Sequence, residues 1–198
     1  LCFFEKPNVS EMDKIKTISN IEFNIINSEH PFQRDLFVKD YYLTLILYLI
    51  KNIEGIYFKG GTALNKIFLN HARLSEDLDF SLSRSEKEVK EELSKILLNS
   101  SFVKEITEGK NVDGFLRMII KCKSEIGESE IFIDLNQRSK LSLPYEEHTV
   151  NHFYVPFIPK FSVKTVAKEE MICEKVAAAI GRNKPRYHYD VYMLLKKG

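Results

Sequence analysis

The sequence lacks the features of several specialised protein classes. Its three cysteines, Cys2, Cys122 and Cys173, lie too far apart for a zinc signature, and their odd number does not suit a disulfide framework. We therefore expect reduced, mostly packed thiols and a cytoplasmic location. The longest apolar run, 41–50, has about half of the residues that a bilayer span needs.

Export signals and a large charge imbalance are also missing. The N-terminus has no basic segment followed by a cleavage site, and because it begins with Leu1 we expect a trimmed or partial chain. The 29 basic and 28 acidic residues give a net charge of +1, which excludes a broadly basic nucleic-acid coat but allows a local basic patch. No repeat or Gly-x-Ser-x-Gly motif occurs, and the histidines show neither metal nor triad spacing.

What remains is the composition of an ordinary folded domain. Hydrophobic residues make up 44% and charged residues 29% of the 198 positions. A chain of this length can build one good-sized core, or one core with a small helical annex.

The order of predicted elements favours an α/β or α+β body with a mixed sheet, followed by a small helical module. We predict helices at Ser10–Ile26, Phe32–Asn52, Thr62–Asn70, Ser85–Leu98, Lys168–Ile180 and Asp190–Leu195, with a break around Pro185 before the last one. We predict strands at Ile56–Phe58, Asp77–Leu82, Leu116–Lys123, Ser129–Asn136 and His152–Phe157. Residues 1–160 would form the core with its N-terminal helices, and residues 161–198 the helical module.

A pair of carboxylates stands on one predicted strand. Asp77 and Asp79 point to the same face because a strand has a period of two, and their Cα atoms lie roughly 7 Å apart. Two such carboxylates repel each other unless a cation lies between them, and their oxygens suit Mg²⁺ or Mn²⁺. The plain alternative is a charged, solvated strand edge.

A glycine turn precedes this pair. Gly60 and Gly61 leave a strand and enter a helix with Thr62, and glycine lets the backbone approach a phosphate closely at a helix N-terminus. The alternative is a tight turn in which Thr62 caps the helix. No Gly-Lys-Ser/Thr ends the turn, so it is not a Walker loop.

A third carboxylate follows on a later strand. Apolar residues occupy positions 131, 133 and 135, so Asp134 stands on the opposite face. Two-metal phosphoryl transfer uses a further carboxylate near the attacking hydroxyl, whereas the structural alternative is a capped strand end.

These motifs carry a resemblance to a known family. The segment Lys59–Leu82, KGGTALNKIFLNHARLSEDLDFSL, resembles the signature of the AbiEii/AbiGii-type nucleotidyltransferase toxins, which include the MenT-type toxins. The family's pattern is Lys-Gly-Gly-Thr-Ala-Leu, a helix, and then Arg-x-Ser-x-Asp-Leu-Asp-Phe. The residues that match its second half are Arg73, Ser75, Asp77, Leu78, Asp79 and Phe80.

A later block of the same family is similar to the segment Glu169–Leu194. The matching residues are Glu174, Lys175, Ala178, Arg182, Arg186 and Asp190. Lys175 and Arg182 are seven residues apart and would share a helix face, although a helix with a solvated basic edge has the same spacing. Taken alone, Asp190 is best interpreted as a helix cap.

The resemblance implies the polymerase-β-like nucleotidyltransferase fold and an enzyme that moves a nucleoside monophosphate from an NTP to an acceptor hydroxyl with Mg²⁺ or Mn²⁺. Its metal ligands would be Asp77, Asp79 and Asp134, and the further catalytic residues Lys175 and Asp190. The nucleotide would be bound by Lys59, Gly60, Gly61, Thr62, Arg73, Ser75 and Arg182. It also implies the toxin of a toxin–antitoxin pair, with a cognate antitoxin protein as partner and an RNA such as tRNA as acceptor.

The chain departs from the family at three points, and two other functions stay open. Tyr187 replaces the first Asp of Arg-Asp-x-x-Asp, Phe132 stands where members often have Lys, and the chain stops at Gly198, before the longer helical domain of most members. The same site would serve a small-molecule nucleotidyltransferase of the antibiotic-modifying kind. A degenerate NTP-binding or partner-binding module without turnover is the third interpretation, which Tyr187 favours and the intact carboxylates oppose.

Overall fold

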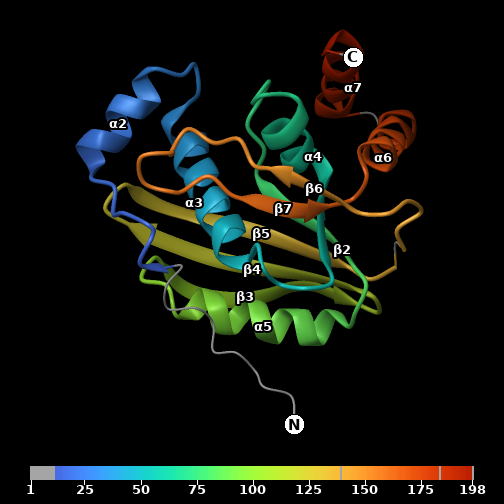
Figure 1. Cartoon of the computed structure of the whole chain (residues 1–198), viewed down its shortest axis with the longest axis horizontal. Coiled ribbons are helices and arrows are strands. Elements are labelled where there is room, and N and C mark those ends of the chain that lie inside the picture. The colour runs from blue at the N-terminus through green and yellow to red at the C-terminus, as the bar shows by residue number, and fades with distance from the viewer. Residues whose placement is uncertain (1–11, 139, 183, 198) are drawn as a thin grey trace.

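One mixed sheet organises the part of the chain that the computed structural model describes, residues 12–138, 140–182 and 184–197. The strands there are β1 (Ile56–Lys59), β2 (Asp77–Leu82), β3 (Val103–Val112), β4 (Phe115–Ser124), β5 (Gly127–Asn136), β6 (Glu146–Thr149) and β7 (Ser162–Thr165). They lie side by side in the order β3-β4-β5-β2-β1-β7-β6 (Figure 1). The predicted mixed α/β class is confirmed.

The helices pack around this sheet. They are α2 (Asn20–Ser28), α3 (Arg34–Ile50), α4 (Gly60–Ala63), the π-helical turn η1 (Leu64–Phe68), α5 (Glu86–Leu98), α6 (Lys168–Gly181) and α7 (Pro185–Lys197). Helix α3 packs on β5 and is buried along almost its whole length, whereas α5 lies along β3 at one edge. Helices α6 and α7 lie next to each other on the other side of the molecule (Figure 1). Within the described ranges, no helix has the length and apolar content to span a membrane.

The centre of the sheet joins strands that are far apart in the sequence. Strand β2 pairs in antiparallel with β1 and in parallel with β5, and the second pairing places Asp79 beside Asp134. Strand β4 pairs in antiparallel with β5 and places Arg117 on the other side of Asp134. Three polar residues therefore form a row across neighbouring strands.

Strand periodicity separates the core from this polar row. Leu78 and Phe80 of β2, and Ile133 and Leu135 of β5, are at most 2% exposed. Their neighbours Asp77, Asp79 and Asp134 lie on the opposite face, as the period of two requires. The predictions of strands around Ile56–Phe58 and Asp77–Leu82, and of a hairpin around Gly127, are confirmed.

Two predicted helices begin elsewhere. Ser10 lies outside the described residues, and α2 starts only after Ser19, whose hydroxyl accepts from the Glu22 amide while the Glu22 carboxylate accepts from the Ser19 amide. The predicted break around Pro185 is confirmed, because α6 ends at Gly181, but the last helix begins at Pro185 and not at Asp190. A proline has no amide hydrogen to lose at the first helical position, so it suits a helix start.

The prediction of a strand over His152–Phe157 is wrong. This segment is a turn in which Tyr154 is completely buried and its carbonyl accepts from the Phe157 and Ile158 amides. The sheet is instead completed by β6 and β7, and the helical part follows β7 at Lys168. The prediction of packed thiols holds for Cys122, whereas Cys173 is exposed and Cys2 lies outside the described residues.

Candidate active site

The glycine turn joins β1 to α4 and leaves no room for a side chain. Gly60 has φ +81°, and a Cβ there would lie 2.1 Å from Oδ2 of Asp79. A Cβ on Gly61 would lie 3.0 Å from Nη2 of Arg73 and 3.2 Å from Oγ of Ser75. The backbone of the turn is therefore packed directly against polar side chains, and a side chain at Gly60 or Gly61 would push these groups away.

The alternative interpretation of the sequence, in which Thr62 caps the helix, is wrong. Helix α4 already begins at Gly60, with Lys59 at the capping position, and the Thr62 hydroxyl donates a short hydrogen bond to the carbonyl of Asp77. This bond ties the glycine turn to the first residue of β2. The predicted helix Thr62–Asn70 is instead the short α4 followed by η1.

The carboxylates repel one another across β2 and β5. Burial raises the pKa of Asp79 to about 6, and repulsion by Asp134 and Asp77 adds to this rise against the attraction of Lys59 and Lys175. Burial also raises the pKa of Asp77, where the charge of Arg117 partly offsets it. A cation between these groups would relieve the repulsion.

Arg117 forms hydrogen bonds with both oxygens of the third carboxylate, Asp134. Its Nε and Nη2 donate to the two oxygens of Asp134, each at 2.7 Å. Among the described residues, no group of three or more histidine, cysteine, aspartate or glutamate side chains is arranged to hold a metal ion. The predicted metal site of three carboxylates is therefore not preformed in the described residues, and each oxygen of Asp134 already accepts one hydrogen bond from Arg117.

The helical module attaches to the site through a second charge cluster. Arg73 donates from Nε and Nη2 to the two oxygens of Asp190, each at 2.8 Å, and Lys175 Nζ lies 3.1 Å from the same carboxylate. Asp190 is completely buried. Burial alone would raise the pKa of Asp190, but the hydrogen bond and charge of Arg73 hold it below its usual value. Lys59 Nζ makes a further link of 2.7 Å to Glu174 of α6.

These clusters border one cavity of about 640 Å³. Its volume falls within the range of small-ligand sites in proteins. Its lining includes most of the predicted site residues: Lys59, Gly60, Gly61, Arg73, Ser75, Asp77, Asp79, Asp134, Lys175 and Arg182. Thr62 and Asp190 do not line it, because their polar atoms are engaged behind the cavity wall.

Other lining residues add positive charge and one aromatic ring. Arg182 and Arg186 donate hydrogen bonds that lower the pKa of the Tyr187 hydroxyl, and Lys175 Nζ lies 5.2 Å from the centre of the Tyr187 ring. Arg182 lies beyond the end of α6 in an extended conformation, so the prediction that it shares a helix face with Lys175 is wrong. Both side chains nevertheless reach the same cavity.

Sequence reasoning missed Arg117. Arg117 lies on β4, and its neighbour on β5 depends on how the two strands are paired. It belongs to no sequence motif. Only the pairing of β4 with β5 shows that it faces Asp134.

The mixed sheet has the polymerase-β-like fold of nucleotidyltransferases. The family model for the nucleotidyl transferase AbiEii toxin, type IV toxin–antitoxin system, matches residues 50–198. The chain belongs to this family, and the resemblance found in the sequence is confirmed.

Solved structures agree on the fold. JHP933 from Helicobacter pylori superposes with a TM-score of 0.63 at 19% identity, covering 83% of this chain and 68% of its own. A candidate nucleotidyltransferase from Helicobacter pylori gives a TM-score of 0.52 at 17% identity, covering 73% of this chain and 59% of its own. The chain thus matches about two thirds or less of the length of these structures. No curated protein sequence matches it significantly.

Proposed function

We propose that this nucleotidyltransferase moves a nucleoside monophosphate from an NTP to a hydroxyl of RNA, in a reaction that depends on Mg²⁺ or Mn²⁺. The observation that carries the proposal is the packing of the Gly60 backbone against the Asp79 carboxylate, with Asp77 and Asp134 beside it. In this proposal a phosphate bound at the glycine turn would lie next to carboxylate oxygens, which suit a divalent cation.

Each side of the cavity has its own task in this proposal. Gly60 and Gly61 would bind the phosphates through their amides, and the Ser75 hydroxyl would donate a hydrogen bond to them. The cations that would neutralise the triphosphate are Lys59, Arg73, Lys175 and Arg182. Asp77 and Asp79 would hold the metal, which supplies charge stabilisation for the leaving pyrophosphate. Thr62 and Asp190 act from behind the cavity wall as positioning residues in this scheme.

Asp134 would act on the acceptor. The acceptor hydroxyl oxygen bonds to the α-phosphorus, the bond between the α-phosphorus and its bridging oxygen breaks, and pyrophosphate leaves. Asp134 would orient the hydroxyl and accept its proton, because it lies beside Asp79 on the neighbouring strand. Arg117 would first have to release at least one of its two bonds to Asp134.

The family points to a biological setting. We propose that the protein is the toxin of a toxin–antitoxin pair, that its acceptor is an RNA such as tRNA, and that a cognate antitoxin opposes it in the cytoplasm. The family description supports the first part, since it names a toxin of a type IV system. The net charge of +1 leaves RNA binding to a local patch, and Arg117, Arg182 and Arg186 at the cavity supply one.

The deciding experiment incubates the protein with each labelled NTP, Mg²⁺ and total RNA. We expect label from at least one NTP to enter RNA. An Asp77→Asn, Asp79→Asn double variant should lose about 1,000-fold in rate or more, because metal charge stabilisation contributes several kcal/mol to catalysis. Asp113→Asn, an exposed carboxylate in the β3–β4 turn, is the matched control.

Transfer by the double variant at the parent rate would refute the role of the carboxylates. Transfer only to small hydroxyl compounds would instead support the antibiotic-modifying class. A parent that binds NTP and transfers to no acceptor would be the degenerate binding module.

A further inference from the structure

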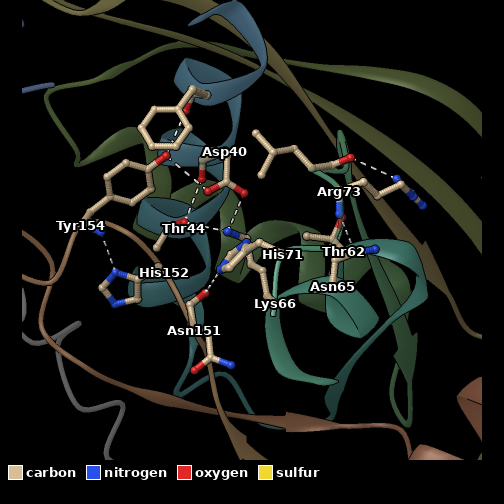
Figure 2. Close-up of polar contacts among 12 residues, drawn as sticks. Asp40, Thr44, Thr62, Asn65, Lys66, His71, Arg73, Asn151, His152 and Tyr154 are labelled. Carbon is tan, nitrogen blue, oxygen red and sulfur yellow. Dashed lines mark hydrogen bonds and ion pairs between the residues drawn. The ribbon is translucent and has the colours of Figure 1, made fainter. Parts of the chain in front are cut away.

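A buried ion pair lies directly behind the glycine turn. Lys66 of η1 donates from Nζ to Oδ1 of Asp40 at 2.6 Å and to the Thr44 hydroxyl at 3.0 Å, and the side chains of Lys66 and Asp40 are each 2% exposed. The Tyr154 hydroxyl donates to the other oxygen of Asp40 at 3.3 Å. Figure 2 shows the Lys66 side chain pointing toward Asp40 and Thr44, with Tyr154 next to Asp40.

Stability alone does not explain such a pair. Removing two charges from water is costly, and well-packed apolar side chains of similar volume often stabilise a core equally well. The core next to the pair includes the completely buried Phe37 and Leu43, and the buried rings of His71 and His152 also lie close to it. The informative feature is therefore where the pair lies and which segment it holds.

The segment that Lys66 belongs to has an unusual backbone. Five residues, Leu64–Phe68, form a π-helical turn, closed by a bond of 2.8 Å from the Leu69 amide to the Leu64 carbonyl. Asn70 and His71 then adopt left-handed conformations with φ 47° and 54°. Such backbone geometry is unfavourable and persists only where surrounding contacts impose it.

Contacts on two sides impose this geometry. On one side Lys66 is bonded to α3 through Asp40 and Thr44. On the other side the Asn151 amide donates to the Lys66 carbonyl at 3.0 Å, and the His71 ring bonds to the Asn151 carbonyl at 3.0 Å (Figure 2). The turn is thus held between α3 and the segment that follows β6.

Asn65 connects this turn to the cavity. Its side-chain amide donates to the Gly61 carbonyl at 3.0 Å, and its side-chain oxygen accepts from the Arg73 amide at 3.1 Å. Asn65 is 2% exposed, so it contacts the cavity wall only from behind. One buried side chain therefore sets the spacing between the backbone of Gly61 and that of Arg73, whose guanidinium closes over the glycine turn.

We propose that Asp40 and Lys66 are positioning residues for the phosphate site. The ion pair holds η1 against α3, and Asn65 transmits this placement to Gly61 and Arg73. The inference rests on the proposed function in one respect, namely that Gly61 and Arg73 bind the phosphates of an NTP.

The main test replaces the pair by apolar side chains, Asp40→Leu with Lys66→Met. Because no unpaired charge is left behind, we expect the unfolding midpoint to stay within about 5 °C of the parent. We expect the dissociation constant of MgNTP, measured by calorimetry, to rise by about tenfold or more, which corresponds to a modest loss of binding free energy. A purely structural role would change the midpoint and not this constant.

A matched control lies on the same helix. The Tyr42 hydroxyl of α3 is buried and donates to the Gly127 carbonyl at 2.7 Å, on the side of the sheet hairpin. We expect Tyr42→Phe to lower the unfolding midpoint and to leave the MgNTP dissociation constant unchanged.

A second variant and a second readout keep the inference testable if the double variant does not fold. Asn65→Ala leaves the ion pair intact and removes the link to Gly61 and Arg73, so we expect the same rise in the dissociation constant. In nucleotide-free protein, amide hydrogen exchange at Arg73 should become faster in both variants and not in Tyr42→Phe.

The outcomes separate cleanly. Unchanged MgNTP affinity and unchanged exchange in the folded double variant, or in Asn65→Ala if the former does not fold, would overturn the inference. A parent protein that binds no NTP would refute the proposed function, and the exchange measurement would still decide whether Asp40 and Lys66 fix the turn.

Discussion

At the scale of single residues, the main feature of the cavity is a set of like-charged carboxylates that lie close together and are partly buried. Asp79 shows this most clearly, since burial and two neighbouring carboxylates raise its pKa to about 6. Arg117, Lys59 and Lys175 offset part of the repulsion from different strands and helices. The carboxylates proposed to hold the metal are thus also residues that destabilise the metal-free protein.

The first prediction concerns the pH dependence of stability. The folded protein keeps a proton on Asp79 up to about pH 6, whereas the unfolded chain loses it near the ordinary pKa of 3.8. The free energy of unfolding of the metal-free protein should therefore fall as pH rises between these values, by at most about 3 kcal/mol. Asp79→Asn removes this contribution, so urea unfolding of parent and variant from pH 4 to 7 measures it. Parallel curves for the two proteins would contradict the assignment.

The second prediction concerns the glycine turn. Gly60→Ala places a Cβ against the Asp79 carboxylate at a residue with φ +81°. The left-handed backbone should cost about 1–2 kcal/mol in stability. Nucleotide transfer should fall by about 100-fold, because the metal ligand is displaced.

Gly114→Ala is the matched control for Gly60→Ala. Gly114 has φ +69° in the β3–β4 turn, and its added Cβ would meet only the flexible side chain of Arg138. It should lose similar stability and keep its activity, measured on the same preparations. Equal activity of the two variants would argue against a special role for Gly60.

At the scale of secondary-structure elements, the joint between α7 and the core is an ion cluster. Asp190 of α7 holds Arg73 of the loop before β2 and Lys175 of α6. A single buried carboxylate thereby aligns two cations that face the cavity. Because Asp190 does not line the cavity itself, we propose that it acts by placing these cations.

The third prediction follows from this joint. Asp190→Asn leaves Arg73 and Lys175 without their counter-charge and should lower stability by roughly 3 kcal/mol. It should also weaken NTP binding, because Arg73 loses its fixed orientation. Thermal unfolding and calorimetry measure the two effects. Tyr189→Phe in the same helix removes only a bond of 3.1 Å to the Ala72 carbonyl and should cost about 1 kcal/mol or less.

At the scale of the whole molecule, the cavity lies where the sheet and the helical module meet. Strands β2 and β5 supply the carboxylates, β4 supplies Arg117 and α4 supplies the glycine turn, while α6 and α7 supply Lys175, Arg186 and Tyr187. Charges of both signs therefore meet in the cavity. In the proposed function, the metal of a metal-bound triphosphate would face the carboxylates and its phosphates would face the cations.

The fourth prediction therefore concerns metal and nucleotide together. An NTP should bind weakly in EDTA and at least about tenfold more tightly with Mg²⁺, because the paired carboxylates otherwise repel the triphosphate. Calorimetry with and without Mg²⁺ measures the difference, and the Asp77→Asn, Asp79→Asn variant should lose it. Equal affinity in EDTA would contradict a metal held by this pair.

The sequence by itself determined the local chemistry of this protein. The period of two fixed which faces of β2 and β5 carry Asp77, Asp79 and Asp134, because strand geometry alternates side chains regardless of context. Two glycines before a helix marked the tight turn between β1 and α4, since few other residues allow the backbone of Gly60. The motif spacing was specific enough to identify the family, which the match over residues 50–198 confirms.

Only the tertiary structure decided what each charge faces. Strand order and register are long-range choices, so no local pattern shows that Arg117 bonds to both oxygens of Asp134 or that Asp40 pairs with Lys66. The same limit applies to Asp190. Its local sequence favours a helix cap, whereas in the folded chain its carboxylate accepts hydrogen bonds from Arg73. Burial and ion pairing depend on segments far apart in the chain, and these come together only when the sheet is closed and the helices are packed on it.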